Sequence, residues 1–516
     1  MDRIQFWVSI LFLFVSVAAV VIWACRVVQW VWLKPRKLEK WLRQQGLNGS
    51  SYRVFYGDTK EMANLSAKAK SKPINLSDDI LPRVLPFYHL AVTKYGAYVC
   101  KNCFVWSGPA PRVIISEPEL MQEVFMNNTI FKRPKPHPLV KFLVSGLGRY
   151  EDQQWARHRK IISPAFYPDK IKCMVPSVTL SCEEMIIKKW ELLTSEKNWC
   201  DFDVQPYLDR FTSDVISRTA FGCSYVEGNK IFSLQTEQAE LTRQVLHSVY
   251  SPDWWLLSSK RSRRMHEIDN EIRGMMKGMI GKRERGMKEK VGDDDEEEDL
   301  DLLGVLLKSG FSTDEVIEEC QHFYFAGQES GSDFLVWIMI LLSIHQTWQD
   351  RARQEVQSVF RNNKPDFDGL NRLKILTMIL NEVLRLYPPS PYTIRTMYEE
   401  TKLGEMKLPP NIILVLSSLL VQRDPDVWGA DAGEFKPERF AEGVAKATKN
   451  RLAFLPFGWG PRTCIGNNFA MMEAKIAIAT ILQRFSFQLS PSYAHSPCFV
   501  VTLKPQFGAP LVLHKI

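Results

Sequence analysis

The strongest constraint on this chain is an uncharged apolar run close to its N-terminus. Residues 6–25 read FWVSILFLFVSVAAVVIWAC, in which two serines are the only polar residues. A helix of this length rises about 30 Å, which is the thickness of the hydrocarbon core of a bilayer. The run leads straight into Arg26, Trp30 and Trp32, without the small-residue cleavage site of a signal peptide. We therefore predict an uncleaved, single-pass membrane anchor that ends at Pro35; a buried core helix is the weaker alternative.

The charges around this run predict the orientation of the anchor. Asp2 and Arg3 precede the run, and the cations that follow it closely are Arg26, Lys34, Arg36, Lys37, Lys40 and Arg43. Positive charge is retained on the cytosolic side of a membrane, so the rest of the chain is expected in the cytosol. The glycosylation sequons should then remain unmodified; they lie at Asn48, Asn64, Asn75 and Asn127.

Beyond the anchor, the composition is that of a packed globular protein, with 45% hydrophobic and 24% charged residues. The net charge of +8 is spread over 516 residues, which is too dilute to indicate nucleic-acid binding. Helical patterns are much longer than extended ones, and no linker or repeat divides the chain. These features predict one large, mostly helical domain.

Several common enzyme chemistries lack their motifs. The sequence has no Gly-x-Gly-x-x-Gly after a strand, no Walker phosphate loop and no His-Glu-x-x-His zinc motif. The acidic run at 293–299 follows a basic helical stretch and predicts a solvated loop rather than a metal site. Cys100 and Cys103 have no second Cys/His pair at zinc spacing, so we interpret them as thiols of a loop or strand edge.

The sharpest chemical signal lies near the C-terminus. Residues 457–466 read FGWGPRTCIG and lead into a long helical pattern, so Cys464 stands in a glycine-rich loop before a helix N-terminus. Free backbone N–H groups and the helix dipole favour the thiolate there, which predicts a lowered pKa for Cys464. Gly460 and Gly466 leave room for a flat ligand, and Arg462 supplies a cation. We interpret Cys464 as a metal ligand; the alternative is a buried cysteine that acts as a small apolar residue.

These residues resemble the haem-binding signature of the cytochrome P-450 superfamily, Phe-x-x-Gly-x-Arg-x-Cys-x-Gly. Every fixed position of the signature is matched, by Phe457, Gly460, Arg462, Cys464 and Gly466. The resemblance implies a mainly α fold with small β-sheets. It also implies haem b (iron protoporphyrin IX) as the cofactor, with the Cys464 thiolate as the iron ligand.

Further motifs of the family occur in the expected order. Glu382 and Arg385 match its Glu-x-x-Arg pair, and Arg439 lies in a segment that matches Pro-x-Arg-Phe. The i, i+3 spacing places Glu382 and Arg385 on one helical face, where an ordinary surface salt bridge is the alternative. The resemblance implies that Glu382, Arg385 and Arg439 form a structural triad behind the haem.

Cationic residues in two other segments match haem-contacting positions of the family. Trp155 and Arg159 match its Trp-x-x-x-Arg helix, and Arg395 matches a further position. In the family these residues approach the haem propionates, and Arg462 completes the cationic set. A doubly anionic cofactor inside a protein needs such partners. Without the resemblance, a Trp–Arg pair would indicate only a packed amphipathic helix.

A long helix is predicted from Ser312 to about Ser343, with Ser312 and Glu315 as a capping box. Gly327, Gly331 and a carboxylate interrupt its apolar middle. Each interior glycine costs about 1 kcal/mol relative to alanine, and a buried carboxylate costs more. We therefore predict a local opening of this helix next to a ligand.

Glu329 and Ser330 in this helix resemble the acid and hydroxyl of the family's oxygen-binding motif. Ser330 replaces the usual threonine, and Gly331 replaces a second threonine of many relatives. The resemblance implies that Glu329 and Ser330 relay protons to bound oxygen. With serine in place of threonine, tight coupling of oxygen reduction to substrate oxidation is less assured. Asp333 on the same helix has no explanation in the sequence.

Other stretches are similar to a plant clan of the family that includes secologanin synthase and triterpenoid oxidases, among them WARHRKIISPAF from Trp155 and PQFGAP from Pro505. The resemblance divides the chain into an anchor and its border (1–33), a basic hinge (34–60) and a haem-thiolate catalytic domain (61–516). We expect this domain on the cytosolic face of the endoplasmic reticulum membrane. It would use O2 and electrons from an NADPH-cytochrome P-450 reductase to hydroxylate or further oxidise a bulky terpenoid, such as a triterpenoid, steroid, iridoid or gibberellin.

Residues that resemble the family's substrate pocket are mainly apolar. They comprise the 245–255 region and Leu139, Val140, Phe142, Phe323, Phe325, Ala326, Ser390, Tyr392 and Phe499. Any one of them is equally consistent with plain core, but together they suit a bulky lipophilic substrate. Two alternatives stay open: a relative that rearranges, desaturates or cleaves a C–C bond, and a non-catalytic haem-binding or sensor protein. The acid and hydroxyl at Glu329 and Ser330 argue against the sensor.

Overall fold

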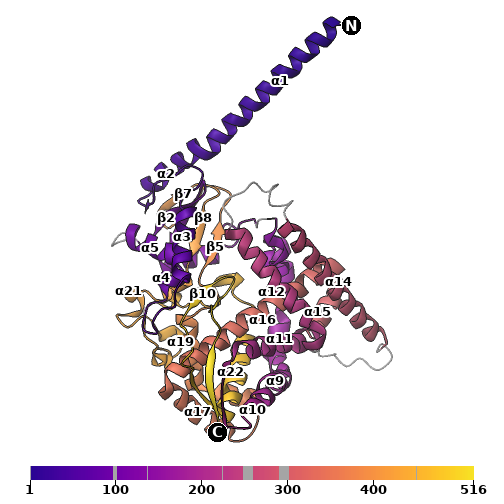
Figure 1. Ribbon diagram of the computed structural model, residues 1–516, viewed down its shortest axis with the longest axis vertical. Helices are drawn as coiled ribbons and strands as arrows, with labels where there is room; N and C mark the ends of the chain where they lie inside the picture. Colours follow the sequence, from indigo (N-terminus) through magenta and orange to yellow (C-terminus); the bar gives the residue numbers. More distant parts are fainter. Residues whose placement is uncertain are drawn as a thin grey trace.

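Helices make up most of the molecule, and the larger β-sheet lies near the root of a projecting N-terminal helix (Figure 1). The structure, a computed structural model, describes residues 2–96, 101–135, 138–223, 225–247, 260–289, 301–448 and 450–516. Its α-helices are α1 (Asp2–Val28), α2 (Lys34–Gln44), α3 (Thr59–Lys70), α4 (Leu81–Val84), α5 (Pro86–Tyr95), α6 (Pro118–Met126), α7 (Gly146–Arg149), α8 (Asp152–Ile162), α9 (Pro168–Cys182), α10 (Lys188–Leu193), α11 (Gln205–Phe221), α12 (Tyr225–His247), α14 (Lys260–Glu289), α15 (Leu302–Lys308), α16 (Thr313–Ile344), α17 (Gln346–Phe360), α18 (Phe367–Arg372), α19 (Lys374–Leu386), α20 (Ser418–Gln422), α21 (Pro425–Trp428) and α22 (Asn467–Arg484).

The strands form small, separate sheets. They are β1 (Asn48–Gly49), β2 (Cys103–Ser107), β3 (Ala110–Ile115), β4 (Trp199–Asp203), β5 (Thr393–Thr396), β6 (Thr401–Leu403), β7 (Met406–Leu408), β8 (Ile413–Leu416), β9 (Phe485–Leu489), β10 (Pro497–Phe499), β11 (Leu503–Pro505) and β12 (Pro510–Lys515). A mixed sheet has the order β1-β2-β3-β8-β5, and an antiparallel one has the order β4-β12-β9. β6–β7 and β10–β11 are antiparallel pairs. The predicted mainly α fold with small β-sheets is confirmed.

Three predictions fall outside the described residues. They concern the acidic run at 293–299, Cys100, and positions 248–255 of the predicted pocket region.

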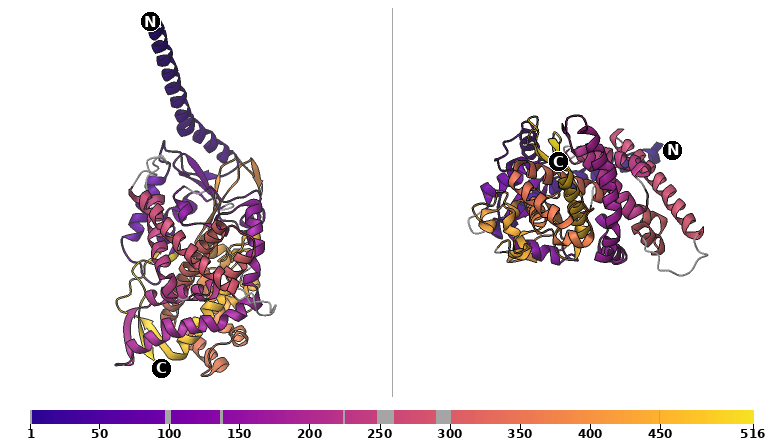
Figure 2. Two further views of the ribbon diagram at one scale, coloured as in Figure 1. Left: turned by 90° about the vertical axis from the view of Figure 1, so that its right-hand side faces the viewer. Right: turned by 90° about the horizontal axis from the view of Figure 1, so that it is seen from below.

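Helix α1 carries the N-terminus away from the body of the molecule in Figure 1 and in the left-hand view of Figure 2. It contains the apolar run, and its large apolar side chains are exposed. Within the described chain, one helix is long and apolar enough to cross a membrane, and α1 forms most of it. The apolar helix that the sequence predicts is therefore present, and the body of the molecule leaves its apolar surface uncovered.

The helical path does not end at Pro35; where the membrane anchor itself ends stays a prediction. A π-helical turn (Gln29–Leu33) follows α1, and α2 continues the path with Pro35 in its first turn. Pro35 removes one backbone hydrogen bond and crowds the carbonyl of the preceding turn, and the π-helical turn directly before α2 is where the continuous helix accommodates this. α1 and α2 thus form one continuous helical segment.

Residues 34–60, the predicted hinge, are bound to the body by α2 and β1. β1 pairs in parallel with β2. Leu42 and Leu47 are buried in the main core, and the indole N–H of Trp41 donates to the carbonyl of Lys407 at 3.0 Å. This segment therefore packs as part of the fold; where the catalytic domain begins stays a prediction.

Helix α16 runs through the centre of the helical body and is packed most closely against α11 (Figure 1). Its predicted capping box is confirmed. The Ser312 hydroxyl accepts from the Glu315 N–H at 3.3 Å, and the Glu315 carboxylate accepts from the Ser312 N–H at 2.9 Å. The box fixes the start of the helix that later carries Ser330 to the candidate site.

The predicted opening of α16 is wrong, because the helix is continuous through Gly327 and Gly331. A Cβ atom on Gly327 would lie 2.8 Å from the Cδ1 atom of Ile216 on α11. A Cβ atom on Gly331 would lie 3.0 Å from Oε2 of Glu473 on α22. The glycines therefore let two neighbouring helices approach α16 closely, which offsets their cost in helix propensity.

A fully buried ion pair connects α19 to the chain that follows α20. The Arg385 guanidinium donates to both carboxylate oxygens of Glu382, each at 2.7 Å. It also donates to the carbonyls of Gln422 (2.8 Å) and Ala432 (2.6 Å). Arg439 Nε lies 3.6 Å from Glu382. The three residues of the predicted triad meet, and their burial excludes the surface salt bridge.

Replacing Glu382 by Gln should lower the free energy of unfolding by about 3–5 kcal/mol, because Arg385 would keep its buried charge without a counter-charge. Glu438→Gln is the matched control: Glu438 pairs with Arg351 at the surface, at 3.2 Å, and should cost no more than about 1 kcal/mol. Chemical denaturation followed by circular dichroism measures both. Equal destabilisation by the two variants would contradict this account.

Candidate functional site

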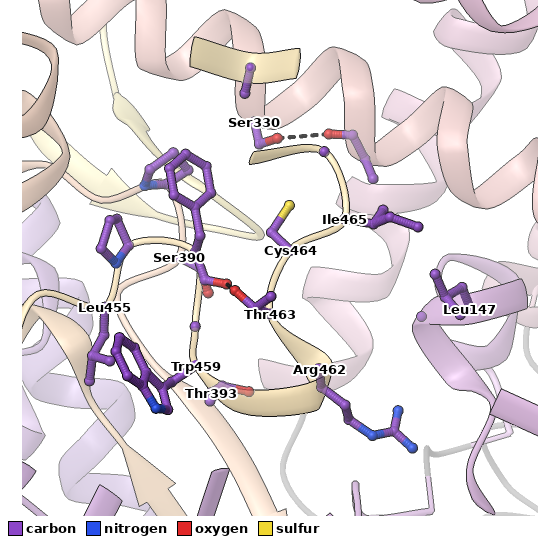
Figure 3. Close-up of a pocket in the computed structure, with 18 of the residues that line it drawn as sticks. Leu147, Ser330, Ser390, Thr393, Leu455, Trp459, Arg462, Thr463, Cys464 and Ile465 are labelled. Atoms are coloured by element: carbon purple, nitrogen blue, oxygen red, sulfur yellow. Dashed lines mark hydrogen bonds between the residues drawn. The ribbon is translucent and has the colours of Figure 1, made fainter. Parts of the chain in front are cut away.

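One cavity brings together most of the residues that the motifs single out (Figure 3). Its volume is about 400 Å³, and its walls include the loop before α22, helices α8 and α16, and the segment around β5. Of the predicted cofactor residues, those in the lining are Trp155, Arg159, Arg395, Phe457, Arg462, Cys464 and Gly466. Figure 3 shows the Cys464 sulfur pointing from its loop toward the side on which Ser330 lies.

Backbone hydrogen bonds fix the loop that presents Cys464. The Cys464 N–H donates to the Phe457 carbonyl at 2.8 Å, and the Thr463 N–H donates to the Gly460 carbonyl at 3.0 Å. Gly460 has a φ of +71°, and a Cβ atom there would lie 2.8 Å from the Phe125 carbonyl oxygen. Gly460 is thus required for close approach to the end of α6, and not to make room for a flat ligand as predicted.

The prediction of a lowered pKa for the Cys464 thiol is wrong for this arrangement. The side chain is exposed to the cavity, but surrounding protein removes it from bulk water, and this desolvation raises its pKa. A hydrogen bond from the Gly466 N–H and the charge of Arg159 oppose the rise without cancelling it. The Gly466 N–H, directly before α22, therefore acts in the expected direction, but desolvation outweighs it.

Four arginines face the cavity, one more than the sequence predicted: Arg133, Arg159, Arg395 and Arg462. Burial and repulsion from Arg395 and Arg462 lower the pKa of Arg133 to about 9. Burial, together with Arg462, lowers the pKa of Arg395 to about 10. Glu151 lies 2.9 Å from Arg462, so one carboxylate partly offsets the set. This excess of buried positive charge fits a ligand with two carboxylates.

Local contacts orient two of the predicted arginines, Arg462 and Arg395. The Arg462 guanidinium stacks over the Trp155 ring, 4.4 Å from its centroid, and donates to the Tyr150 carbonyl at 3.1 Å. Arg395 donates to the Ile394 carbonyl at 2.8 Å. Both guanidinium groups are therefore held at the wall rather than free to turn away.

Arg133 enters the site through a contact that no local pattern reveals. Lys132 and Thr396 form an isolated β-bridge, with N–H···O distances of 2.8 and 2.7 Å. The bridge places the following residue, Arg133, beside Arg395, which precedes Thr396. Only a long-range pairing signal between these segments could have found it.

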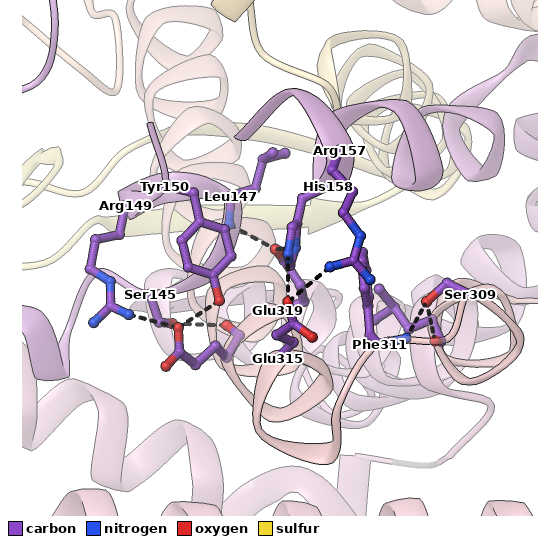
Figure 4. A network of polar contacts seen from close by, with 12 residues as sticks. Ser145, Leu147, Arg149, Tyr150, Arg157, His158, Ser309, Phe311, Glu315 and Glu319 are labelled. Carbon is purple, nitrogen blue, oxygen red and sulfur yellow. Dashed lines mark hydrogen bonds and ion pairs between the residues drawn. The ribbon is translucent and has the colours of Figure 1, made fainter. Parts of the chain in front are cut away.

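A buried polar network joins α8 to α16 (Figure 4). His158 Nδ1 lies 2.7 Å from Oε1 of Glu319, and both side chains are fully buried. The second oxygen of Glu319 accepts from the Leu147 N–H at 3.1 Å. The Tyr150 hydroxyl donates to Glu318 at 2.8 Å. These contacts fix the helix that carries Trp155 and Arg159 against the central helix, and the sequence did not predict them.

Ser330 and Glu329 occupy different surroundings. Ser330 lines the cavity and donates its hydroxyl proton to the Ala326 carbonyl at 2.7 Å. Glu329 lies outside the described lining, where its carboxylate is 3.2 Å from Lys504 Nζ and accepts from the Thr502 hydroxyl at 3.3 Å. A joint role of Glu329 and Ser330 in proton transfer stays a prediction.

Asp333 belongs to the same acidic group as Glu329, one helical turn further along α16. It is buried, and both desolvation and the nearby Glu329 charge raise its pKa well above the usual value. Lys504 counters part of this repulsion. The structure thus places Asp333 near Lys504, a neighbour that the sequence did not predict.

The predicted substrate residues divide into two groups. Phe323, Ala326, Ser390 and Tyr392 line the cavity. Outside its described lining are Leu139, Val140, Phe142, Phe325 and Phe499. Leu139 and Phe142 instead pack in a separate cluster with Val245 and Met265, and Phe499 contacts the Tyr392 ring at a centroid distance of 5.3 Å.

Glu473 on α22 also lines the cavity, and sequence reasoning missed it because its helix has the pattern of plain core. Its side chain faces Gly331, and Oε1 has no hydrogen-bond partner among the described residues. Burial raises the pKa of Glu473 to about 8. At neutral pH this carboxyl is therefore largely protonated and leaves the positive charge of the arginines uncompensated.

Comparison with known proteins finds similarity over nearly the whole chain. The sequence profile of the family described as Cytochrome P450 matches residues 87–506. Cytochrome P450 72A397 of Kalopanax septemlobus is 52% identical over 507 residues, 96% of each chain. Cytochrome P450 CYP72A219 of Panax ginseng is 52% identical over 516 residues, 98% of each chain. The 11-oxo-beta-amyrin 30-oxidase of Glycyrrhiza uralensis is 49% identical over 519 residues, 97% of each chain.

Gly460→Ala should destabilise the cysteine loop, since the new Cβ would meet the Phe125 carbonyl in a backbone conformation that already disfavours side chains. We expect a loss of about 2 kcal/mol or more in unfolding free energy. Gly458→Ala is the control for the conformation alone, because its φ is +72° but its Cβ would meet nothing within 4 Å. The account fails if both variants unfold at the same denaturant concentration.

The Glu473 carboxyl should make stability depend on pH. Between its usual pKa of 4.5 and its folded value of about 8, the folded state holds a proton that the unfolded state has released. Unfolding free energy should therefore fall as pH rises through this window. Glu473→Gln should remove on the order of 2 kcal/mol of that fall between pH 6 and 8, whereas Gln at the exposed Glu400 should not. Unchanged pH dependence in denaturation of Glu473→Gln would refute the assignment.

Proposed function

Since this chain belongs to the cytochrome P450 family and is a monooxygenase, we propose that Cys464 holds haem b and that the substrate is a bulky terpenoid. One observation carries the proposal: a single cavity contains the Cys464 thiol and a wall of four arginines. A thiolate ligand for iron and cations for two propionates are the groups that this cofactor requires.

The residues present fit the cofactor by charge and by space. Arg133, Arg159, Arg395 and Arg462 would pair with the propionates, and Trp155 would support Arg462 from behind its guanidinium plane. Gly466 would let the porphyrin lie close to the cysteine loop, because a Cβ atom there would meet nothing nearer than 4.0 Å. Haem iron with a thiolate ligand supplies the activation of molecular oxygen that a monooxygenase needs.

The chain itself supplies proton handling on the side opposite Cys464. Ser330 faces the cavity with a hydroxyl that can exchange its bond to Ala326 for one to a water. Glu329 would exchange protons with solvent from its position beside Lys504 and pass them to Ser330 through water. Glu329 would have to leave its ion pair with Lys504 as part of this route.

Lipophilic lining supports a terpenoid substrate. The lining includes the apolar side chains of Phe323, Ala326, Phe334 and Leu384, which suit a lipophilic substrate. The name of the 49%-identical Glycyrrhiza uralensis protein states that it oxidises a β-amyrin derivative at carbon 30. By analogy, hydroxylation or further oxidation of a triterpenoid is the favoured reaction. C–C cleavage, desaturation or rearrangement would give different products from the same cavity.

Electrons should come from a membrane-bound NADPH-cytochrome P450 reductase, because the sequence contains no dinucleotide or phosphate-binding motif. The exposed apolar α1 supports anchoring in a membrane, and the cations after it support a cytosolic body at the endoplasmic reticulum. Docking on the face near the Cys464 loop would bring the reductase closest to the iron.

Cys464→Ala should abolish the red-shifted Soret band of the reduced CO complex, because no thiolate would remain at the iron. Cys498→Ala is the matched control, since Cys498 is another free cysteine, which is buried and lies outside the described lining of the cavity. A full-strength band in Cys464→Ala would refute the ligand assignment.

The substrate class is tested with the same variants. Purified protein, reductase and NADPH are incubated with a panel of triterpenes, steroids, iridoids and gibberellins, and products are identified by mass. Wild-type protein and Cys498→Ala should add oxygen to a triterpenoid, and Cys464→Ala should not. If the protein oxidises only a steroid, an iridoid or a gibberellin, the haem assignment stands and the proposal of a triterpenoid substrate is overturned.

A further inference from the structure

A groove separate from the cysteine cavity lies where the anchor joins the body. It has a volume of about 670 Å³ and is lined by Arg36, Glu39, Lys40, Arg43, Gln44, Ser51 and Tyr52. The first five lie on one face of α2, because their spacing follows the turns of a helix. Three cations and one carboxylate give the groove a net charge of +2. It is therefore a shallow basic groove, open to solvent, in which α2 and the 51–52 segment meet.

Internal contacts use only part of this charge. Arg43 Nη2 lies 3.0 Å from Glu39, and the same nitrogen donates to the Gly49 carbonyl at 3.0 Å. The second Glu39 oxygen accepts from the Tyr52 N–H at 3.2 Å. Glu39 is thus occupied by partners within the groove. Among the described residues, neither Arg36 nor Lys40 has a carboxylate partner.

The groove is held in shape before any ligand binds. The Tyr52 hydroxyl donates to the Val31 carbonyl at 2.7 Å, which fixes the wall formed by Ser51 and Tyr52 to the end of the anchor. The Arg36 guanidinium stacks over Trp32, 4.2 Å from the ring centroid. These two contacts hold Tyr52 and Arg36 in place, so that these side chains lose less conformational entropy when an anion enters.

The groove lies at the depth of lipid headgroups. Trp30, Trp32 and Leu33 are exposed at the end of the apolar segment, in the position of an interfacial aromatic belt. Arg36 follows Leu33 by three residues, or about 4.5 Å of helix. The headgroup layer of a bilayer is about 5–8 Å thick on each side. Arg36 thus lies in the layer that contains lipid phosphates. Lys40 lies about 10.5 Å of helix beyond Leu33, and its long side chain tilts back toward that layer because helical side chains point toward the N-terminus.

We propose that this groove binds the phosphate of an anionic phospholipid from the cytosolic leaflet, with Arg36 and Lys40 as its cationic partners. Ser51 and Gln44 add a hydroxyl and an amide as hydrogen-bond donors to the phosphate oxygens. The charge of the groove complements an anionic headgroup and not a zwitterionic one. The proposal rests on the anchor orientation proposed above and goes beyond it in assigning a specific lipid site.

The test compares lipids retained by the full-length holoprotein from nanodiscs of phosphatidylcholine that contain a minority of phosphatidylglycerol. Native mass spectrometry measures the enrichment of phosphatidylglycerol on the protein. Wild-type protein should be enriched, and the double variant Arg36→Gln/Lys40→Gln should lose this enrichment roughly tenfold. Lys34→Gln/Lys37→Gln removes the same charge from the same helix outside the groove and should retain most of it.

Equal losses in the two double variants would overturn the proposal in favour of diffuse attraction by the basic segment, and so would an unaffected groove variant. Excess inorganic phosphate should leave the enrichment intact; if it abolishes the enrichment, the groove is a site for free phosphate and the lipid assignment fails. Flotation of the wild-type protein with pure phosphatidylcholine vesicles tests the anchor separately. Failure to float would overturn the anchor, whereas flotation without enrichment would overturn only the lipid site. An intact CO band shows that each variant is folded.

Discussion

Repulsion between the arginines of the Cys464 cavity is the interaction around which the site is organised. Desolvation alone disfavours each guanidinium charge, and the neighbouring cations add to that cost. The fold holds them in place with the Lys132–Thr396 bridge, the Arg462–Glu151 ion pair and the His158–Glu319 contact behind α8. A dianionic cofactor would relieve this repulsion, so that its binding and the stability of the surrounding fold are thermodynamically linked.

Close helix packing is the second requirement of the site. Gly327 and Gly331 bring α11 and α22 against α16 without a side chain between them. This approach places Glu473 beside the helix that carries Ser330, and desolvates it enough to keep it protonated near neutral pH. A charged residue at that position would change the electrostatic balance that the arginines set.

Features encoded by neighbouring residues were predictable from the sequence, and features that depend on distant contacts were not. The apolar run, the capping box of Ser312 and Glu315, and the cysteine loop each occupy one short stretch, so pattern and spacing sufficed. Arg133 reaches the cavity only because a β-bridge joins its neighbour to β5, and the role of Glu473 depends on how α22 meets α16. The errors have the same origin: Gly460 was interpreted as room for a ligand, and Gly327 and Gly331 as an opening of the helix next to one, but all three accommodate other parts of the chain.

The continuous helical segment from Asp2 to Gln44 has a mechanical consequence. A membrane-spanning helix tilts when its apolar length differs from the local thickness of the bilayer. In the proposed membrane orientation, α2 is fastened to the body through Trp41 and Leu42, so that such a tilt would be transmitted as a rotation of the whole domain rather than absorbed by a flexible tether. Membrane thickness would thereby set which edge of the domain contacts the lipid, and with it the path by which a lipophilic molecule passes from the bilayer into the protein.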